Sequence, residues 1–149
     1  MWCYRPGLTG LIVSKSKEKR WHEMISKYAE KYGPVAGLPT YPIQHHHVVG
    51  RKTKQRLPHP RSCESILIGP WFVIPLPFHL HDVSSDHLNN VTHHEKNFVK
   101  AFGSQRALWW NMCRDIMAMD THGSPFDPDQ IGDLPFNSDV VEAIRATNK

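Results

Sequence analysis

Apolar residues near the start of the chain recur at the spacing of one helix face. Within residues 14–32 they stand three, four, seven and eleven positions after the first of them, in the series Trp21, Met24, Ile25, Tyr28 and Tyr32. Side chains at these spacings lie on one side of an α-helix. We therefore predict an amphipathic helix that Gly33-Pro34 ends, followed by a loop rich in Gly and Pro.

Two short apolar stretches in the middle of the chain predict strands. Residues 43–49 are partly β-branched and run into a glycine and a basic segment, which is typical of a strand entering a turn. Residues 66–74 are mostly apolar, but a Gly-Pro pair interrupts them and leaves 71–74 as the continuous strand. Pro77 suits the first turn of a helix, so we expect a short helix over residues 77–83.

The rest of the chain predicts three more helices. Thr92 and Glu95 have the spacing of a capping box, in which the hydroxyl and the carboxylate each bond a free backbone N–H, and Gly103 would end the helix that they open. A serine then caps a helix over residues 105–119, whose apolar positions share one side. The segment between this helix and a final helix over residues 138–147 is rich in Gly, Pro and acidic residues and is expected to be irregular.

The positive charge is concentrated in the first part of the chain. Through residue 61 there are 12 Lys and Arg against three Glu, a net of +9, whereas the remainder has six basic and 11 acidic residues, a net of −5. Two basic runs carry the excess: Lys15, Lys17, Lys19 and Arg20, then Arg51, Lys52, Lys54, Arg56 and Arg61. A basic run alone is often only a solvated surface, but the second begins four residues after a histidine triplet. Such a run can contact the phosphates of a polyanion.

Histidine is unusually dense in the middle of the sequence. Nine of the eleven histidines lie between His45 and His94. Imidazole is a common metal ligand and a proton acceptor near neutral pH. Because alternate side chains of a strand point to opposite faces, we expect His45 and His47 to share one face and His46 to point to the other.

The order of these features resembles the ββα-metal, or HNH, nucleases. In that superfamily a His pair on one strand supplies a metal ligand and a general base, and a following helix supplies further ligands. The matching segments are His46-His47-Val48-Val49-Gly50-Arg51 and Ile74-Pro75-Leu76-Pro77-Phe78-His79-Leu80-His81. A third segment, from His93-His94-Glu95-Lys96-Asn97-Phe98 through Phe102-Gly103, is most similar to the phage RecA-dependent nucleases of the Ref type.

This resemblance implies the fold and the divisions of the chain. It implies an α+β protein with a small ββα-metal hairpin-helix core surrounded by several α-helices. Residues 1–149 would form a single domain, since this length is ordinary for one. Its parts would be a basic N-terminal helix (14–32), the ββα-metal core (43–103) and a helical C-terminal region (104–149).

The resemblance also implies roles for individual histidines. His46 would be a metal ligand, His47 the general base and His81 a second ligand, with Zn²⁺ or Mg²⁺/Mn²⁺ as the divalent ion. Only one of His79 and His81 can aim at the same ion, because positions two apart on a helix differ by ~200° around its axis. Ser85 stands where many relatives carry another histidine, so the third ligand is open among His94, His93, Asp86 and His87, in that order.

The implied activity is hydrolysis of DNA phosphodiester bonds by an endonuclease of phage or mobile-element origin. Basic residues after the general base would hold neighbouring phosphates: Arg51, Lys52, Lys54 and Arg56. DNA would be the partner, together with a RecA-like recombinase filament. The asparagine that orients the base in the resembled family has no counterpart near Phe72. Its absence favours an alternative, a non-catalytic zinc-stabilised module that binds nucleic acid. A metal-dependent hydrolase of a smaller substrate is the second alternative.

Other features favour structural or negative interpretations. Trp109 and Trp110 could stack on bases, but packing on a helix is the favoured interpretation. The acidic side chains Asp127, Asp129 and Asp133 lack the order of a calcium loop. The odd number of cysteines, Cys3, Cys63 and Cys113, indicates no disulfide framework. With no apolar run long enough to cross a bilayer and no signal-peptide pattern, we expect a cytoplasmic protein without a membrane partner, in the host cytoplasm if phage-encoded.

Overall fold

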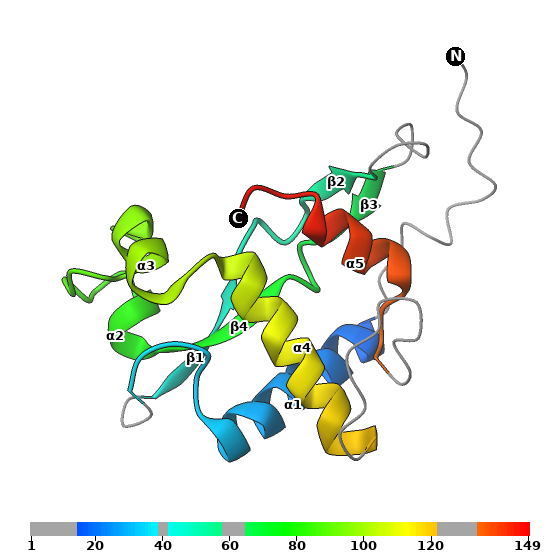
Figure 1. Cartoon of the computed structure of the whole chain (residues 1–149), viewed down its shortest axis with the longest axis horizontal. Coiled ribbons are helices and arrows are strands. Elements are labelled where there is room, and N and C mark those ends of the chain that lie inside the picture. Colours follow the sequence, from blue (N-terminus) through cyan, green and yellow to red (C-terminus); the bar gives the residue numbers. More distant parts are fainter. Residues whose placement is uncertain (1–14, 39–41, 58–64, 122–133) are drawn as a thin grey trace.

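The fold of this chain alternates short strands with helices. The computed structural model describes residues 15–38, 42–57, 65–121 and 134–149. Figure 1 shows α2 and α3 at one end of the molecule and the small β2–β3 hairpin with α5 at the other. The elements are α1 (Lys15–Tyr32), β1 (Ile43–His47), β2 (Lys54–Arg56), β3 (Ser65–Leu67), β4 (Val73–Pro77), α2 (Phe78–His81), α3 (Glu95–Phe102), α4 (Gln105–Thr121) and α5 (Ser138–Arg145).

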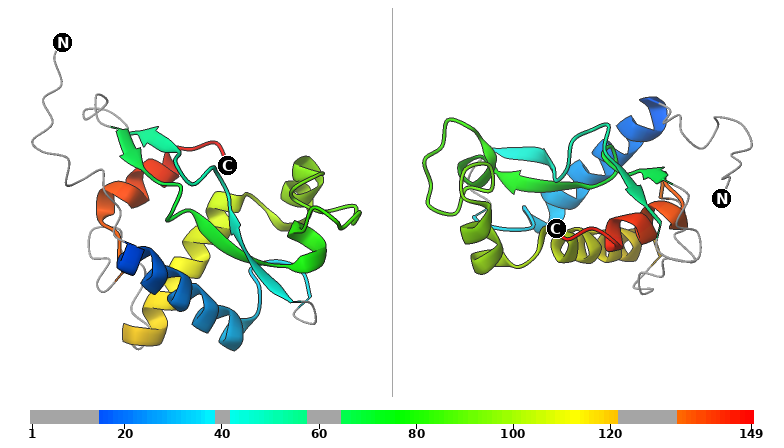
Figure 2. Two further views of the ribbon diagram at one scale, coloured as in Figure 1. Left: turned by 180° about the vertical axis from the view of Figure 1, so that it is seen from behind. Right: turned by 90° about the horizontal axis from the view of Figure 1, so that it is seen from above.

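The central strand pair joins the histidine triplet to the buried apolar stretch. Strand β1 pairs antiparallel with β4, with His46 opposite Ile74 and His47 opposite Val73. All five residues of β4 are buried, as expected of a continuous apolar run. Helix α2 follows β4 directly, with Pro77 at its N-cap position. Strands β2 and β3 pair antiparallel in a second small sheet, set apart from the first in both views of Figure 2.

Two helices pack against β4 and build the core. Both α1 and α4 contact β4 and each other, and α4 crosses β4 in Figure 1. The indole N–H groups of Trp21 and Trp109 both donate to the backbone carbonyl of Trp71, at 2.9 and 3.0 Å. These two large aromatic side chains are fully buried. The shared carbonyl ties the two helices to the entry of β4, which fixes the strand that the histidines lie against.

A close backbone approach holds the turn that follows β1. A Cβ atom on Gly69 would lie 2.2 Å from the carbonyl oxygen of Gly50 and 2.5 Å from the carbonyl carbon of Arg51. Real side chains do not tolerate such distances to backbone atoms, so only glycine fits here. The Gly-Pro pair that interrupts the apolar stretch therefore also allows the basic turn to pack against it.

The structure confirms most of the predicted elements, with three corrections. The helix at residues 14–32, the strand at 43–49 and the final helix are present within a few residues of the expected bounds. The stretch at 66–74 gives two strands, β3 (Ser65–Leu67) and β4 (Val73–Pro77), instead of one at 71–74, and Pro77 ends β4 as the N-cap of the shorter helix α2.

The third correction is a cap. Thr92 is not the N-cap of the next helix. The side-chain oxygen of Asn90 accepts hydrogen bonds from the N–H groups of Thr92 and His93, which delays the helix so that His94 takes the N-cap position.

The mixture of helices with small antiparallel sheets establishes the α+β class. Among the described residues, no helix has the length and apolar character required to cross a membrane. Trp109 is buried and Trp110 is partly buried beneath the Arg145 guanidinium, so the predicted packing of this pair is confirmed. Cys113 is buried, as expected. Other predictions lie outside the described residues: Cys3, Cys63, Arg61, Asp127, Asp129 and Asp133.

Candidate functional site

The three histidines of β1 divide between its two faces. His45 and His47 both lie against His22 of α1, with ring centroids 4.9 and 5.6 Å from that ring. His46 lies on the opposite face, 4.9 Å from the ring of His81 on α2. The alternation expected from the strand period is therefore confirmed. The predicted ligand pair, His46 and His81, is brought together.

His81 is oriented by a relay that ends on a carboxylate. The Gln44 amide N–H donates to Asp82 Oδ2 at 2.9 Å, and the Gln44 carbonyl oxygen lies 2.6 Å from His81 Nδ1. Because a carboxylate only accepts, the amide nitrogen must face Asp82 and the amide oxygen must face His81. Nδ1 of His81 therefore donates its proton to Gln44, which leaves the lone pair on Nε2.

A second relay of the same kind orients His46. Gln105, at the start of α4, donates through its amide nitrogen to Glu95 Oε1 at 3.3 Å, and its carbonyl oxygen lies 2.8 Å from His46 Nε2. Gln105 is one of two polar residues in the described chain that are buried. By the same reasoning Nε2 of His46 carries the proton and Nδ1 carries the lone pair. Amide or carboxylate acceptors of this kind fix the tautomer of metal-binding histidines in other proteins.

The same surroundings keep these two imidazoles neutral. Burial lowers the pKa of His46 from 6.5 to about 4, although its hydrogen bond to Gln105 acts in the opposite direction. Burial also lowers the pKa of His81, which the nearby carboxylate of Asp82 partly offsets. A neutral imidazole retains the lone pair that a metal ion requires. Both rings are therefore ready to act as ligands at neutral pH.

His47 faces a different set of side chains, which sequence reasoning did not find. Glu18 and His22 of α1 join His47 in a group whose candidate ligand atoms all lie within 4.8 Å of one another. Such a group could hold a metal ion. Burial lowers the pKa of His47, the nearby Arg51 guanidinium lowers it further, and Glu18 acts against them. The detectable signal in the sequence is the four-residue spacing of Glu18 and His22, which puts both on one helix face.

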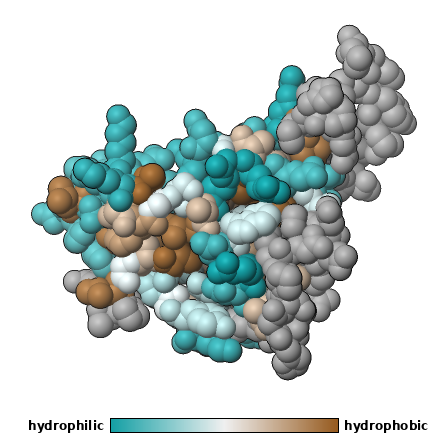
Figure 3. Space-filling model, viewed as in Figure 1, coloured by the Kyte–Doolittle hydropathy of each residue, from teal (hydrophilic) through white to brown (hydrophobic). Residues whose placement is uncertain are grey.

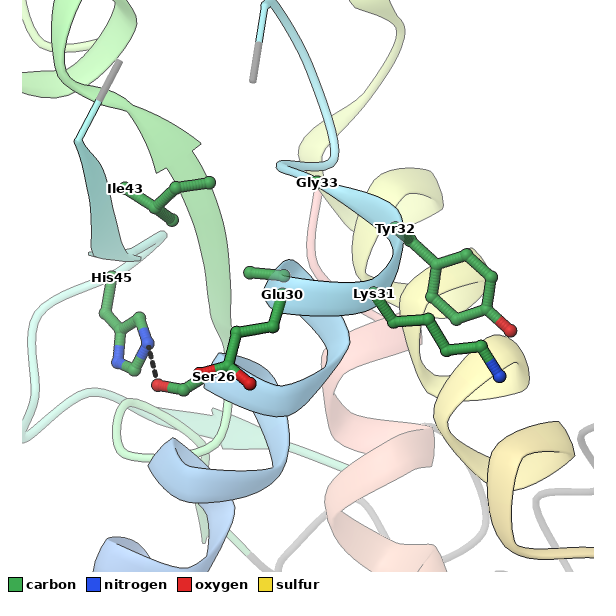
Figure 4. A pocket seen from close by; sticks show the side chains of 8 residues that line it. Ser26, Glu30, Lys31, Tyr32, Gly33, Ile43 and His45 are labelled. Atoms are coloured by element: carbon green, nitrogen blue, oxygen red, sulfur yellow. Dashed lines mark hydrogen bonds between the residues drawn. The ribbon is translucent and has the colours of Figure 1, made fainter. Parts of the chain in front are cut away.

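His45 completes the contacts on this face of β1. Its Nδ1 is hydrogen-bonded to His22 Nδ1 at 3.1 Å, and its Nε2 to the Ser26 hydroxyl at 3.2 Å. Figure 4 shows the bond from Ser26 to His45 at the wall of an open pocket of about 560 Å³ between α1 and β1. Burial lowers the pKa of His45 to about 4, so its ring is neutral. A neutral ring has one N–H, which it can donate either to His22 or to Ser26.

The four candidates for a third ligand have other contacts or are exposed. His93 bonds the Val83 carbonyl through Nε2 at 2.8 Å, and the His87 ring lies 4.9 Å from that of His79. His94 and Asp86 are exposed. Across the described ranges, no hydrogen bond or ring contact joins any of the four candidates to His46 or His81. The assignment of His94 as a ligand stays a prediction.

The predicted phosphate-binding residues lie on the exposed side of the turn and of β2. Arg51 and Lys52 occupy the turn after β1, and Lys54 and Arg56 are exposed on the same side of β2. The Arg51 guanidinium donates to Glu18 Oε1 at 2.6 Å and remains 66% exposed. This ion pair places the first turns of α1, which carry the other basic run, beside the turn. The two basic runs are thus adjacent in space.

Hydrophobic surface gathers at the other end of the molecule. Val83 and Leu88 in the loop between α2 and α3 are 72% and 68% exposed. Figure 3 shows hydrophobic residues at this edge and also nearer the middle of the visible face, among hydrophilic areas. The apolar loop is therefore separate from the basic turn.

Comparison with known proteins identifies no relative. No family model, no curated protein and no solved structure matches this chain.

Proposed function

We propose that this protein is a metal-dependent endonuclease that hydrolyses DNA phosphodiester bonds. The observation that carries the proposal is the pair His46 and His81, which come from a strand and a following helix and are each oriented by a glutamine-to-carboxylate relay. Two relays of the same kind on facing imidazoles indicate selection for a fixed ring orientation. Fixed, neutral imidazoles serve as metal ligands.

The tautomers of His46 and His81 would suit a divalent cation. His46 would coordinate it through Nδ1 and His81 through Nε2, since the other nitrogen of each ring donates to an amide oxygen. Two protein ligands, or three with His94, leave coordination positions open for substrate, as in catalytic rather than structural sites. When bound, the cation supplies Lewis-acid stabilisation of the scissile phosphate and of the leaving 3′ oxygen.

His47 is the proposed proton acceptor. It is the last residue of β1, next to His46 but on the other face of the strand. It is neutral because its pKa is lowered, and it would take the proton from a water that reaches it past the end of the strand. The negative charge of Glu18 favours the protonated ring that results. Arg51 and Lys52 in the next turn, with the exposed cations of β2, would hold phosphates on either side of the scissile bond.

The test is plasmid nicking with Mg²⁺ or Mn²⁺. The wild type is expected to convert supercoiled to nicked DNA, and His47→Ala to lose at least ~100-fold of that rate because general-base catalysis contributes about this much. Glu23→Gln, a change at an exposed position of α1, is the control. Salt-sensitive DNA binding without nicking would instead identify the non-catalytic module, and equal nicking by wild type and His47→Ala would refute the assigned base.

A further inference from the structure

We propose that Glu18, His22 and His47 form a second divalent-cation site, suited to zinc. The site joins α1 to β1 on the face of the strand opposite His46. It is therefore distinct from the His46–His81 pair. Its donors are two imidazole nitrogens and one carboxylate oxygen, a set that favours Zn²⁺ over Mg²⁺.

The first support is the state of the donor atoms. Nε2 of His22 and Nε2 of His47 are buried and have no hydrogen-bond partner. A buried polar nitrogen without a partner costs free energy, so its presence requires an explanation. The two imidazoles and the Glu18 carboxylate can offer ligand atoms all within 4.8 Å of one another. A cation bound between them would satisfy both nitrogens at once.

The second support is the chain of hydrogen bonds behind His22. Its Nδ1 is engaged with His45 Nδ1 at 3.1 Å, and the far nitrogen of His45 is engaged with Ser26. One proton is shared between Nδ1 of His22 and Nδ1 of His45. Whichever of the two rings carries it, Nε2 is the nitrogen of His22 that remains for the Glu18–His22–His47 site. When the proton is on Nδ1 of His22, Nε2 has the lone pair of a ligand. Outer contacts of this kind hold ligating histidines in place.

Arg51 provides the electrostatic counterpart of this site. Its guanidinium already bonds one oxygen of Glu18 at 2.6 Å, and its positive charge opposes a cation. The Arg51 side chain is 66% exposed and that of Glu18 is 19% exposed, so the arginine can leave toward solvent while the carboxylate stays. Cation and arginine therefore compete for Glu18. Removing Arg51 should tighten Zn²⁺ binding severalfold, the opposite of what removing a structural support would do.

Occupation of this site has a functional consequence that rests on the proposed function. A cation bound to His47 would occupy the ring that is proposed to accept the proton from water. Zinc bound at Glu18, His22 and His47 would thus inhibit hydrolysis supported by Mg²⁺ or Mn²⁺. The same cation would release Arg51 from Glu18.

The site is tested by counting Zn²⁺ bound to the full chain in competition with a chromophoric chelator. The wild type and Glu23→Gln, a change at an exposed position of α1, are expected to bind two zinc ions, and His22→Ala one. Glu18→Gln, which keeps the side-chain shape, should weaken zinc binding at the second site at least ~10-fold. This variant replaces His22→Ala in the test if circular dichroism shows that His22→Ala does not fold. Arg51→Ala should tighten it. Unchanged zinc stoichiometry and affinity in His22→Ala and Glu18→Gln would overturn the proposal.

The inhibitory role is tested separately by adding Zn²⁺ to the plasmid assay. Relative to its own zinc-free rate, His22→Ala should need at least ~10-fold more Zn²⁺ for half inhibition than the wild type. Equal sensitivity would refute inhibition through this site, because zinc would then act at His46 and His81. If the wild type nicks no DNA at all, the proposed function fails, while the zinc count still decides whether the second site exists.

Discussion

The metal-free protein is expected to lose stability in mild acid because of His46. Burial lowers the pKa of this ring to about 4 in the folded chain, against 6.5 for an ordinary histidine such as that of the unfolded chain. Below pH 6.5 the unfolded chain therefore binds a proton that the folded chain does not. The free energy of unfolding falls as the pH drops from 6.5 toward 4 and levels off below that.

The size of this effect follows from the two pKa values. A difference from 6.5 to about 4 corresponds to ~3 kcal/mol once both states are protonated, and to ~2 kcal/mol between pH 7 and pH 5. Other histidines with lowered pKa values add to the total slope. The contribution of His46 is isolated by His46→Gln, whose side chain is neutral at both pH values.

Urea denaturation in chelator at pH 7 and pH 5 measures the effect. The wild type should lose ~2 kcal/mol more of its free energy of unfolding over this interval than His46→Gln does. If the wild type and His46→Gln lose the same free energy of unfolding, the His46 ring is not held neutral. It would then not be a metal ligand that is ready at neutral pH.

Three further outcomes are expected. Replacing Gln105 by Leu leaves the N–H of His46 without its acceptor, so zinc should bind at that ring with an affinity lower by ~10-fold or more in a competition assay. Unchanged zinc affinity would show that the hydrogen bond from His46 to Gln105 does not matter for binding. Lys54→Ala should weaken DNA binding and reduce the dependence of log K on log salt by about one, whereas an unchanged salt slope would exclude a phosphate contact. Gly69→Ala should prevent folding because its Cβ meets backbone atoms. Gly103→Ala, in open space but at φ 93° and ψ 178°, should cost ~1–3 kcal/mol in thermal melts, and similar effects of the two changes would refute the close packing.

Periodic features made much of the fold predictable. The face of α1 and the buried apolar run of β4 are local patterns, so their existence followed from spacing alone. The opposite orientations of His46 and His47 followed from the strand period. The cap of α3 could not be predicted from Thr92 and Glu95, because Asn90 competes for the same backbone N–H groups.

The site was predictable only in part because its supporting residues are distant in sequence. Gln105 lies 59 residues from His46, and its role depends on how α4 starts relative to β1. His22 and Glu18 belong to a helix whose apolar face explains its sequence well enough without them. The contact between α1 and β1 depends on tertiary packing, which sequence periodicity does not reveal. The sequence therefore did not indicate that His22, outside the dense central group of histidines, would lie beside His47.

Long-range ¹H–¹⁵N correlation spectra of the histidine rings show whether His46 and His81 hold one divalent cation. Without metal, Nε2 of His46 and Nδ1 of His81 should carry the protons, as their bonds to Gln105 and Gln44 require. On addition of Zn²⁺, the resonances of His46 Nδ1 and His81 Nε2 should shift together. Opposite tautomers, or ring nitrogens of both residues that do not respond to Zn²⁺, would contradict the account.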